Sequence, residues 1–172
     1  MKGTIMETIV QAKRVLEIFK EMSQIPRESG NEKGISDYIV NFGKNLGLEV
    51  HQDEVLNVVI KKAASPGYEN RPSIILQGHI DMVCVKDHDS NHDFSKDPIA
   101  NIIEGEWMHA DHTTLGADNG MGAAMMLALL EDDNQQHGPM QLLFTTNEET
   151  GMDGAFALKE GQVTGDYLLN LD

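Results

Sequence analysis

Three short apolar segments, each ending in polar residues, constrain the fold of this chain more than any other feature. They read "SIILQGHID" from residue 73, "PMQLLFTTNEE" from residue 139 and "DYLLNLD" from residue 166. A buried helical pattern over residues 119–131 and a short one over 152–161 separate them. Apolar strands that alternate with helices are typical of a sheet covered on both sides. We therefore predict an α/β fold whose sheet is mainly parallel, with helices on both faces.

The first seventy residues are predicted to extend and cover this sheet. Apolar residues at helical spacing predict helices over 6–23 and 35–46, and "QIPRESGNEKG" between them breaks the pattern with proline and glycine. "LEVHQD" and "NVVIKKA" are predicted to form two strands of a hairpin or meander, which makes the sheet mixed. Residues 86–104 are predicted to be a long polar loop, followed by a short strand in "EWMHAD".

The composition argues against several classes of protein. A length of 172 residues suits one domain, and the net charge of −15 argues against binding to nucleic acid or anionic membranes. The single cysteine, Cys84, permits no internal disulfide, which suits a reducing compartment. The N-terminus lacks the features of a signal peptide, and residues 121–130, the longest apolar run, are fewer than the about 20 that span a bilayer. We therefore expect a cytoplasmic protein.

Acidic side chains follow the ends of the predicted strands. In open α/β sheets, ligands bind beyond the carboxyl ends of parallel strands, so groups at these positions are expected to gather at one edge. One histidine and five carboxylates at one edge would repel strongly unless a cation lies among them. These residues are His79, Asp81, Asp118, Glu148, Glu149 and Asp172. They predict a metal site, preferably for zinc, manganese or cobalt, which suit carboxylates with an imidazole.

The spacing within this set predicts different roles. His79 and Asp81 are two residues apart, so both point to one face of a strand, and a metal-bound histidine usually donates its second ring N–H to a carboxylate. Glu148 and Glu149 are adjacent and would point to opposite sides of an extended chain, so that one can bind metal while the other acts as general acid or base. Taken singly, each pair is better explained as solvated polar groups after a strand, because such short matches are common.

Asp118 has two interpretations. It precedes an apolar helix, so its carboxylate could cap the helix N-terminus. A carboxylate can also bridge two metal ions about 3.5–4 Å apart, and Gly116 and Gly120 would allow tight turns around it. His109 and His112 are interpreted as surface or substrate-side groups, because neither follows an apolar strand.

Four motifs and the chain's last segment resemble a known family. "GHIDMV", "HDFSKDPI", "TTLGADNGMGAA" and "TTNEETGMDGA", followed by "LLNLD", resemble the co-catalytic zinc peptidases, which include carnosinase, aminoacylase and tripeptide aminopeptidase. The motifs come in family order through nearly the whole chain, and "TTLGADNG" resembles the dipeptidase branch in particular.

The resemblance implies a zinc-exopeptidase-like catalytic domain and a role for each site residue. His79, Asp118 and Asp172 would hold one zinc ion, and Asp118 would bridge to a second zinc ion that Glu149 also holds. Asp81 would orient His79, Glu148 would be the general base, and the peptide bond after Asp118 would be cis.

The implied reaction is metal-dependent hydrolysis of dipeptides, including dipeptides that end in histidine. Family members are much longer, so residues 1–172 are expected to be the N-terminal part of an incomplete catalytic domain. A lid domain and a returning C-terminal part with a further histidine ligand would be missing, so these residues alone are expected to be inactive. A homodimer is expected only for the full-length enzyme.

Two alternatives remain open from the sequence, and a third is weak. The first is another hydrolase of the same family, a tripeptide aminopeptidase or an N-acyl amino-acid deacylase. The second is a catalytically inactive metal-binding fragment. A nucleotide-binding domain is disfavoured, because neither GxGxxG nor GxxxxGK[ST] follows a predicted strand.

Overall fold

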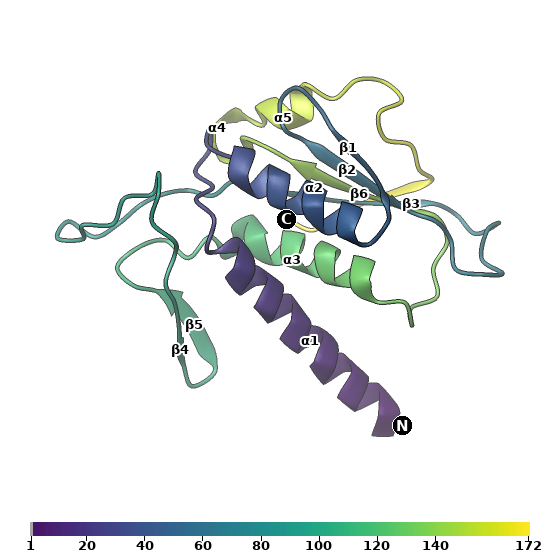
Figure 1. The fold of residues 1–172 in the computed structure, drawn as a ribbon, viewed down its shortest axis with the longest axis horizontal. Helices are drawn as coiled ribbons and strands as arrows, with labels where there is room; N and C mark the ends of the chain where they lie inside the picture. Colours follow the sequence, from purple (N-terminus) through teal and green to yellow (C-terminus); the bar gives the residue numbers. More distant parts are fainter. Residues whose placement is uncertain (1) are drawn as a thin grey trace.

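The protein is built around a mixed β-sheet (Figure 1). The computed structural model describes residues 2–172, with side chains described from residue 12 onward. Within this part of the chain, five strands form the sheet in the order β1-β2-β6-β3-β7. Their bounds are β1 Glu49–Gln52, β2 Val58–Lys62, β3 Ile74–His79, β6 Met140–Thr145 and β7 Tyr167–Asn170.

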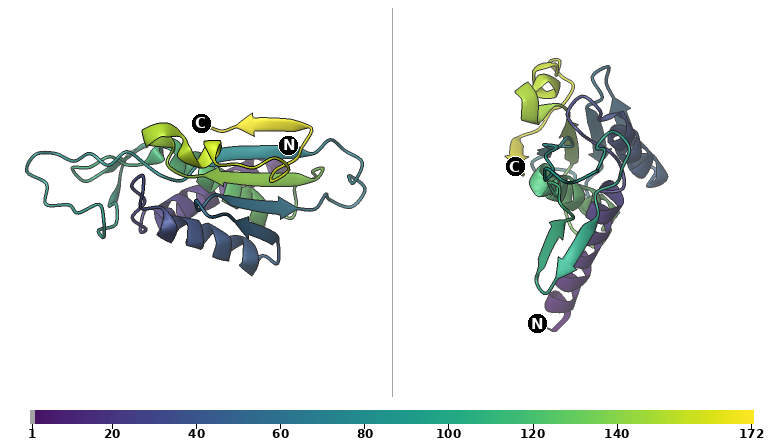
Figure 2. Two further views of the ribbon diagram at one scale, coloured as in Figure 1. Left: turned by 90° about the horizontal axis from the view of Figure 1, so that it is seen from above. Right: turned by 90° about the vertical axis from the view of Figure 1, so that its left-hand side faces the viewer.

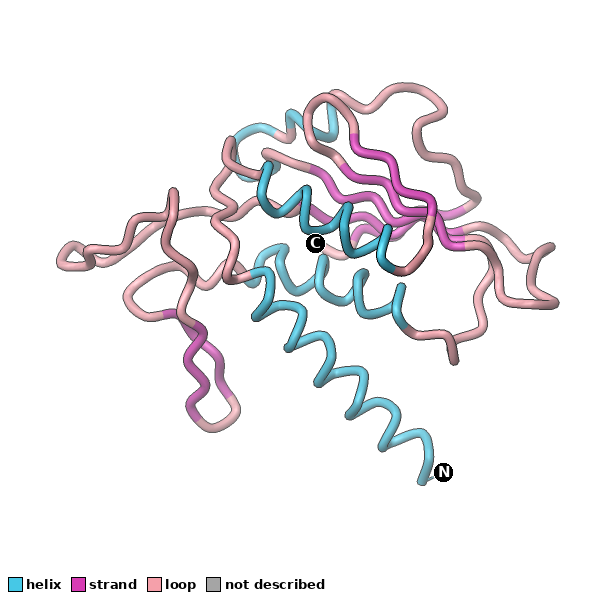
Figure 3. The backbone as a smooth tube through the Cα atoms, viewed as in Figure 1, coloured by secondary structure: helices cyan, strands magenta, loops and turns pink. Residues whose placement is uncertain are grey.

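The strand directions confirm the predicted mixed α/β sheet. β6, β3 and β7 run parallel, whereas β1 and β2 form an antiparallel hairpin that joins the sheet antiparallel to β6. The parallel register pairs His79 with Thr145 and Gln77 with Asn170. The three predicted apolar strands therefore end at the same edge, and the loops that follow β3 and β6 leave the sheet on one side (Figure 3).

Three long helices enclose the main core on one side of the sheet, where two of them pack on the strands and the first packs against the third. They are α1 Lys2–Met22, α2 Lys33–Asn45 and α3 Ala117–Glu131. Phe19 of α1, Ile39 of α2 and Leu127 of α3 are fully buried against strand residues such as Leu142 and Phe144. The helices predicted over 6–23, 35–46 and 119–131 are confirmed. The side chain of Ile9, one of the apolar residues behind the first prediction, lies outside the described side chains.

The other face carries a thinner cover. Val59, Ile75 and Leu143 point to this side and pack beneath Leu158 and Val163. The short helices α4 Glu148–Gly151 and α5 Asp153–Phe156 come just before this segment. The helix predicted over 152–161 is thus wrong in length, because the chain turns after Phe156 and packs Leu158 against the sheet.

A separate hairpin projects from the body (Figure 2). β4 Asn101–Glu104 pairs antiparallel with β5 Trp107–Ala110, and together they form the second sheet within the described residues. The strand predicted in "EWMHAD" is confirmed, but the loop predicted over 86–104 is shorter than expected, because residues 101–104 pair with it. Within the described residues, every helix is too short or too polar to cross a membrane.

The unequal covering of the sheet predicts a difference between two leucines. Leu142 of β6 is 0% exposed, whereas Leu168 of β7 is 56% exposed. We expect Leu142→Ala to lower the free energy of unfolding by about 2–5 kcal/mol, because it leaves a cavity in the main core. Leu168→Ala should cost less than about 1 kcal/mol. Denaturant unfolding of both variants checks this, and equal losses would contradict the packing described.

Candidate metal centre

The candidate site forms where the parallel strands end. His79 is the last residue of β3, and β6 is followed after two residues by Glu148 and Glu149. β7 is followed by Asp172, and Asp118 lies at the start of α3. The predicted convergence at one edge is found in the structure. Two groups of ligand atoms each lie within 4.8 Å of one another, one from His79, Asp118 and Asp172, and the other from His79, Glu148 and Glu149.

The imidazole of His79 lies at the centre of this cluster. Its side chain is 1% exposed, and its Nδ1 is 3.2 Å from Asp81 Oδ1. Its Nε2 faces the other carboxylates, at 3.1 Å from Asp118, 3.7 Å from Asp172 and 3.9 Å from Glu148. The two ring nitrogens therefore face different partners, Nδ1 the carboxylate of Asp81 and Nε2 the other carboxylates of the cluster.

Asp81 is the most deeply buried carboxylate of the set. It accepts hydrogen bonds from the Ser29 hydroxyl at 2.7 Å and from the backbone N–H groups of Glu148 and Glu149 at 3.1 and 3.2 Å. Burial raises its pKa, but the His79 contact and these three donors outweigh burial and bring the pKa to about 2. An ionised carboxylate only accepts hydrogen bonds, so Nδ1 of His79 carries the proton that it shares with Asp81.

Glu148 and Glu149 are not in an extended chain, so the argument that they point to opposite sides is wrong. They open the helical turn α4, directly after Asn147, whose φ of 52° is left-handed. Both carboxylates approach His79. They differ in surroundings instead, since burial and the nearby charge of Asp118 raise the pKa of Glu149.

Asp118 does not cap its helix in this structure. Gly116 is the N-cap residue of α3, with a left-handed φ of 71°, and Asp118 itself has non-helical dihedral angles. Its side chain is 73% exposed and its carboxylate contacts Nε2 of His79. The peptide bond between Asp118 and Asn119 is cis, as the family resemblance implies.

Asn119 is a site residue that sequence reasoning missed. Its side-chain N–H group donates to the Leu171 carbonyl at 3.0 Å and to Asp172 Oδ1 at 3.1 Å, which holds Asp172 near the cluster. A Cβ atom at Gly78 or Gly122 would collide with the Asn119 side chain. Gly78 directly precedes His79, and Gly122 lies three residues after Asn119. These two glycines are the sequence signal that could have identified Asn119 as tightly packed.

The electrostatics of the cluster favour a bound cation. Burial lowers the pKa of His79, but the carboxylates of Asp81, Asp118 and Asp172 more than compensate and raise it to about 9. Without a metal, the imidazole of His79 therefore binds a proton and carries a positive charge at neutral pH. A divalent cation at Nε2 would replace that proton and offset the mutual repulsion of the carboxylates. Imidazole nitrogen with carboxylate oxygens is a ligand set that fits zinc, manganese or cobalt.

One histidine cannot serve two ions here. His79 belongs to both groups of ligand atoms, but its Nδ1 is held by Asp81, which leaves Nε2 for a single ion. An ion beside Glu148 and Glu149 would therefore depend on carboxylates among the described residues. The two groups are unequal as metal sites, and the one formed with Asp118 and Asp172 has the shorter contact to Nε2.

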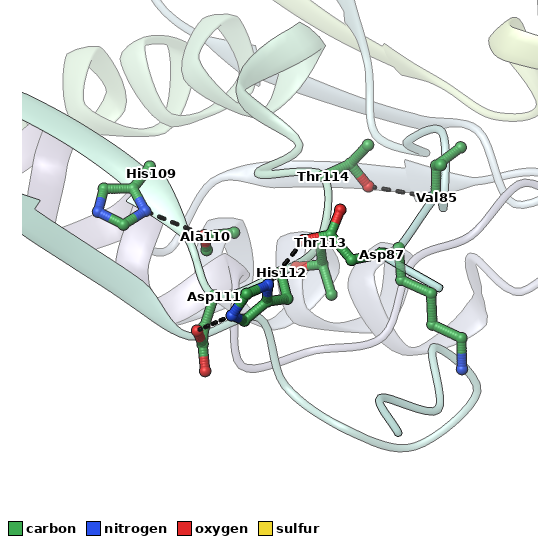
Figure 4. A pocket seen from close by; sticks show the side chains of 9 residues that line it. Val85, Asp87, His109, Ala110, Asp111, His112, Thr113 and Thr114 are labelled. Carbon is green, nitrogen blue, oxygen red and sulfur yellow. Dashed lines mark hydrogen bonds and ion pairs between the residues drawn. The ribbon is translucent and has the colours of Figure 1, made fainter. Parts of the chain in front are cut away.

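A cavity of about 520 Å³ lies apart from this cluster (Figure 4). Residues 85–87 and 109–114 line it, including His109 and His112. His112 is exposed, and its Nδ1 is 2.6 Å from Asp87 Oδ2. The interpretation of these two histidines as surface or substrate-side groups fits their exposure, and neither belongs to the acidic cluster.

Comparison with known proteins is consistent with this geometry. Residues 75–171 match the profile of "Peptidase family M20/M25/M40". Cytosol non-specific dipeptidase of Escherichia coli is 48% identical over 156 residues, covering 91% of this chain and 32% of the relative. The crystal structure of aminoacylhistidine dipeptidase from Vibrio alginolyticus superimposes with a TM-score of 0.89 at 46% identity, covering 91% of this chain and 32% of that one.

A tripeptidase from Staphylococcus aureus superimposes with a TM-score of 0.78 at 28% identity, covering 93% of this chain and 43% of that one. The chain thus spans about a third of the length of the dipeptidases that it matches.

The His79–Asp81 contact predicts the effect of Asp81→Asn. An amide can donate to Nδ1 and move the ring proton to Nε2, which would block the nitrogen that faces the cluster. We expect zinc affinity to fall about 10–100-fold, as is typical when the outer partner of a ligand histidine is lost. Competition with a chromophoric chelator measures it. Asp87→Asn, which alters the exposed His112 pair, is the matched control and should bind zinc like the parent.

Proposed function

Because the chain belongs to peptidase family M20/M25/M40, we propose that it forms the metal-binding part of an enzyme that hydrolyses dipeptides. The observation that carries this proposal is the convergence of His79 and the cluster of carboxylates at one edge of the sheet. The relatives named for dipeptide hydrolysis, at 48% and 46% identity, support this substrate class. The name of the second supports dipeptides that end in histidine as substrates.

The proposed centre holds two zinc ions. His79, Asp118 and Asp172 would bind one, and Asp118 with Glu149 would bind the other, with cobalt or manganese as substitutes. When bound, the ions would supply Lewis-acid polarisation of the peptide carbonyl and make a water molecule acidic near neutral pH. Asp81 would fix the ring of His79 through Nδ1, so that Nε2 keeps its direction toward the cluster.

Glu148 is the proposed general base. Its carboxylate lies 3.9 Å from His79 Nε2, and its own backbone N–H is held by Asp81. In this role the carboxylate takes a proton from the attacking water and returns it to the nitrogen of the leaving amine. The new C–O bond forms first, the peptide C–N bond then breaks as its nitrogen receives the proton, and the products are two amino acids.

The relatives are much longer than this chain, which matters for whether residues 1–172 can hydrolyse a peptide on their own. The chain spans 32% of the E. coli dipeptidase, and we propose that residues 1–172 are the N-terminal part of such a catalytic domain. Turnover would then need the remaining part. A cytosolic location is proposed from the name of the same relative, and the acidic charge supports a peptide rather than nucleic acid as partner.

A tripeptide substrate is the second candidate. The similarity to the S. aureus tripeptidase, with a TM-score of 0.78, favours it. A panel of dipeptides and tripeptides with matched N-terminal residues separates the two, because a dipeptidase should reject the longer substrates.

The base assignment predicts the behaviour of Glu148→Gln. In a protein of the relatives' length that carries these residues, we expect kcat to fall about 10²–10⁴-fold, because the amide cannot accept the proton of water. Zinc binding should stay close to that of the parent. Steady-state hydrolysis of a dipeptide ending in histidine measures kcat, with exposed Glu160→Gln as the matched control. Near-normal turnover of Glu148→Gln would refute the assignment.

The ligand assignment predicts the zinc stoichiometry of this chain. Calorimetric titration of the metal-stripped chain should detect one tight site, since Nε2 of His79 serves one ion. Asp118→Ala should lower the zinc affinity of this site more strongly than loss of an outer partner does, which typically lowers it about 10–100-fold. Asp111→Ala, an exposed aspartate of the neighbouring loop, should leave it unchanged. Equal zinc affinity in both variants would remove Asp118 from the ligand set.

A further inference from the structure

The loop between α1 and α2 runs past the edge of the sheet where the acidic cluster lies (Figure 1). Glu28 forms an isolated parallel bridge with Met82, and the N–H of Met82 donates to the carbonyl of Arg27 at 3.1 Å. The loop therefore continues beside the chain that leaves β3. Residues 27–32, "RESGNE", are called the clamp loop below.

Arg27 joins two of the segments that carry site residues. Its side chain is 2% exposed, and Nη1 donates to the carbonyls of Ile80 and Asp81, both at 3.1 Å. Nη2 donates to the carbonyl of Gly116 at 2.5 Å, two residues before Asp118. Burial lowers the pKa of Arg27 to about 10, so the guanidinium keeps its charge at neutral pH. A buried positive charge thus lies behind the acidic cluster.

The glycines of "LGADNG" make room for this guanidinium. A Cβ atom at Gly116 would lie 2.5 Å from Nη2 of Arg27, and one at Gly120 would lie 2.6 Å from it. Side chains at these positions would push the guanidinium off the carbonyls it binds. The turn around Asp118 and the position of Arg27 are therefore mutually dependent.

Ser29 and Glu32 hold the remaining segments. The hydroxyl of Ser29 donates to Asp81 Oδ2 at 2.7 Å, beside the two glutamate N–H groups that share this carboxylate. Glu32 is buried, and its Oε1 accepts the N–H of Asn147 at 2.9 Å, immediately before Glu148. Glu32 is the N-cap residue of α2, yet its carboxylate makes no cap hydrogen bond and reaches to Asn147 instead.

We propose that the clamp loop positions the metal-binding side chains by holding three separate segments at once, an inference that rests on the proposed metal centre. Arg27 holds the end of β3 and the turn before Asp118, Ser29 holds Asp81, and Glu32 holds the start of the glutamate turn. These contacts bridge 52–115 residues of sequence. Each of these contacts ends at or beside a segment that carries a proposed metal ligand. A shift of the clamp loop would therefore move the ligands relative to one another.

The test uses Ser29→Ala and Glu32→Ala, with cobalt(II) as the probe. Both variants should bind cobalt about 10–100-fold more weakly than the parent and change its visible absorption, because the ligands lose their outer support. In the metal-free chain, amide hydrogen exchange should quicken at Glu148 and Glu149 in the first variant and at Asn147 in the second.

Two controls separate positioning from general stability. Glu32→Gln keeps an oxygen that accepts the Asn147 N–H, so it should restore affinity, spectrum and exchange. Ser36→Ala removes a hydrogen bond of 2.7 Å to the Leu56 carbonyl, away from the cluster, and should lower the melting temperature without changing cobalt binding. If Glu32→Ala does not fold, Ser29→Ala decides the test, because its hydroxyl is only partly buried.

The outcomes distinguish this inference from the proposed function. Cobalt affinity and absorption like those of the parent in Ser29→Ala and Glu32→Ala would overturn the clamp loop and leave the metal centre standing. A parent chain that binds no cobalt would refute the metal centre. Amide hydrogen exchange in the two variants would then decide alone. Faster exchange confined to Asn147, Glu148 and Glu149 would support the positioning role of the clamp loop. Exchange like that of the parent would overturn it.

Discussion

A buried carboxylate, Asp81, makes the interaction on which the rest of the site depends. It contacts Nδ1 of His79, the hydroxyl of Ser29 and the N–H groups of Glu148 and Glu149. A charge in the interior is costly unless such partners surround it, so each of these groups is drawn to one place. The same four contacts tie together β3, the loop before α2 and the glutamate turn. The orientation of the His79 imidazole and the positions of Glu148 and Glu149 therefore depend on the same carboxylate.

The parallel strands supply the second constraint. Because β6, β3 and β7 run in one direction in close register, the segments after them must emerge at one edge. The sheet therefore brings acidic groups together that would otherwise stay apart in solution. Their repulsion is an energetic cost that the hydrophobic core under α1, α2 and α3 has to offset. Residues that conflict with local stability in this way are expected at functional sites.

The centre of the sheet and its edge strand β7 differ in burial. Leu142 and Phe144 of β6 are fully buried, whereas β7 exposes Tyr167, Leu168 and Leu169. The site lies at the end of β3, between β6 and this exposed strand β7, so Asp172 sits on a less supported element than His79 does. Asn119 compensates locally, since its side chain holds both the Leu171 carbonyl and the Asp172 carboxylate.

The sequence by itself determined most of the elements and the set of residues that meet at the site. Strand and helix periods are local, and the rule that parallel strands share a carboxyl edge predicts that His79, Asp81, Asp118, Glu148, Glu149 and Asp172 lie together. It could not decide what depends on distant contacts. The helical turn of Glu148 and Glu149 follows from N–H groups bound 67 and 68 residues away at Asp81, and a local pattern suggested an extended chain instead. Arg27, Ser29 and Glu32 look like ordinary loop residues, because their partners lie 52–115 residues along the chain. Only the tertiary structure brings these partners within hydrogen-bonding distance, and only there does a loop between two helices become part of the candidate metal centre.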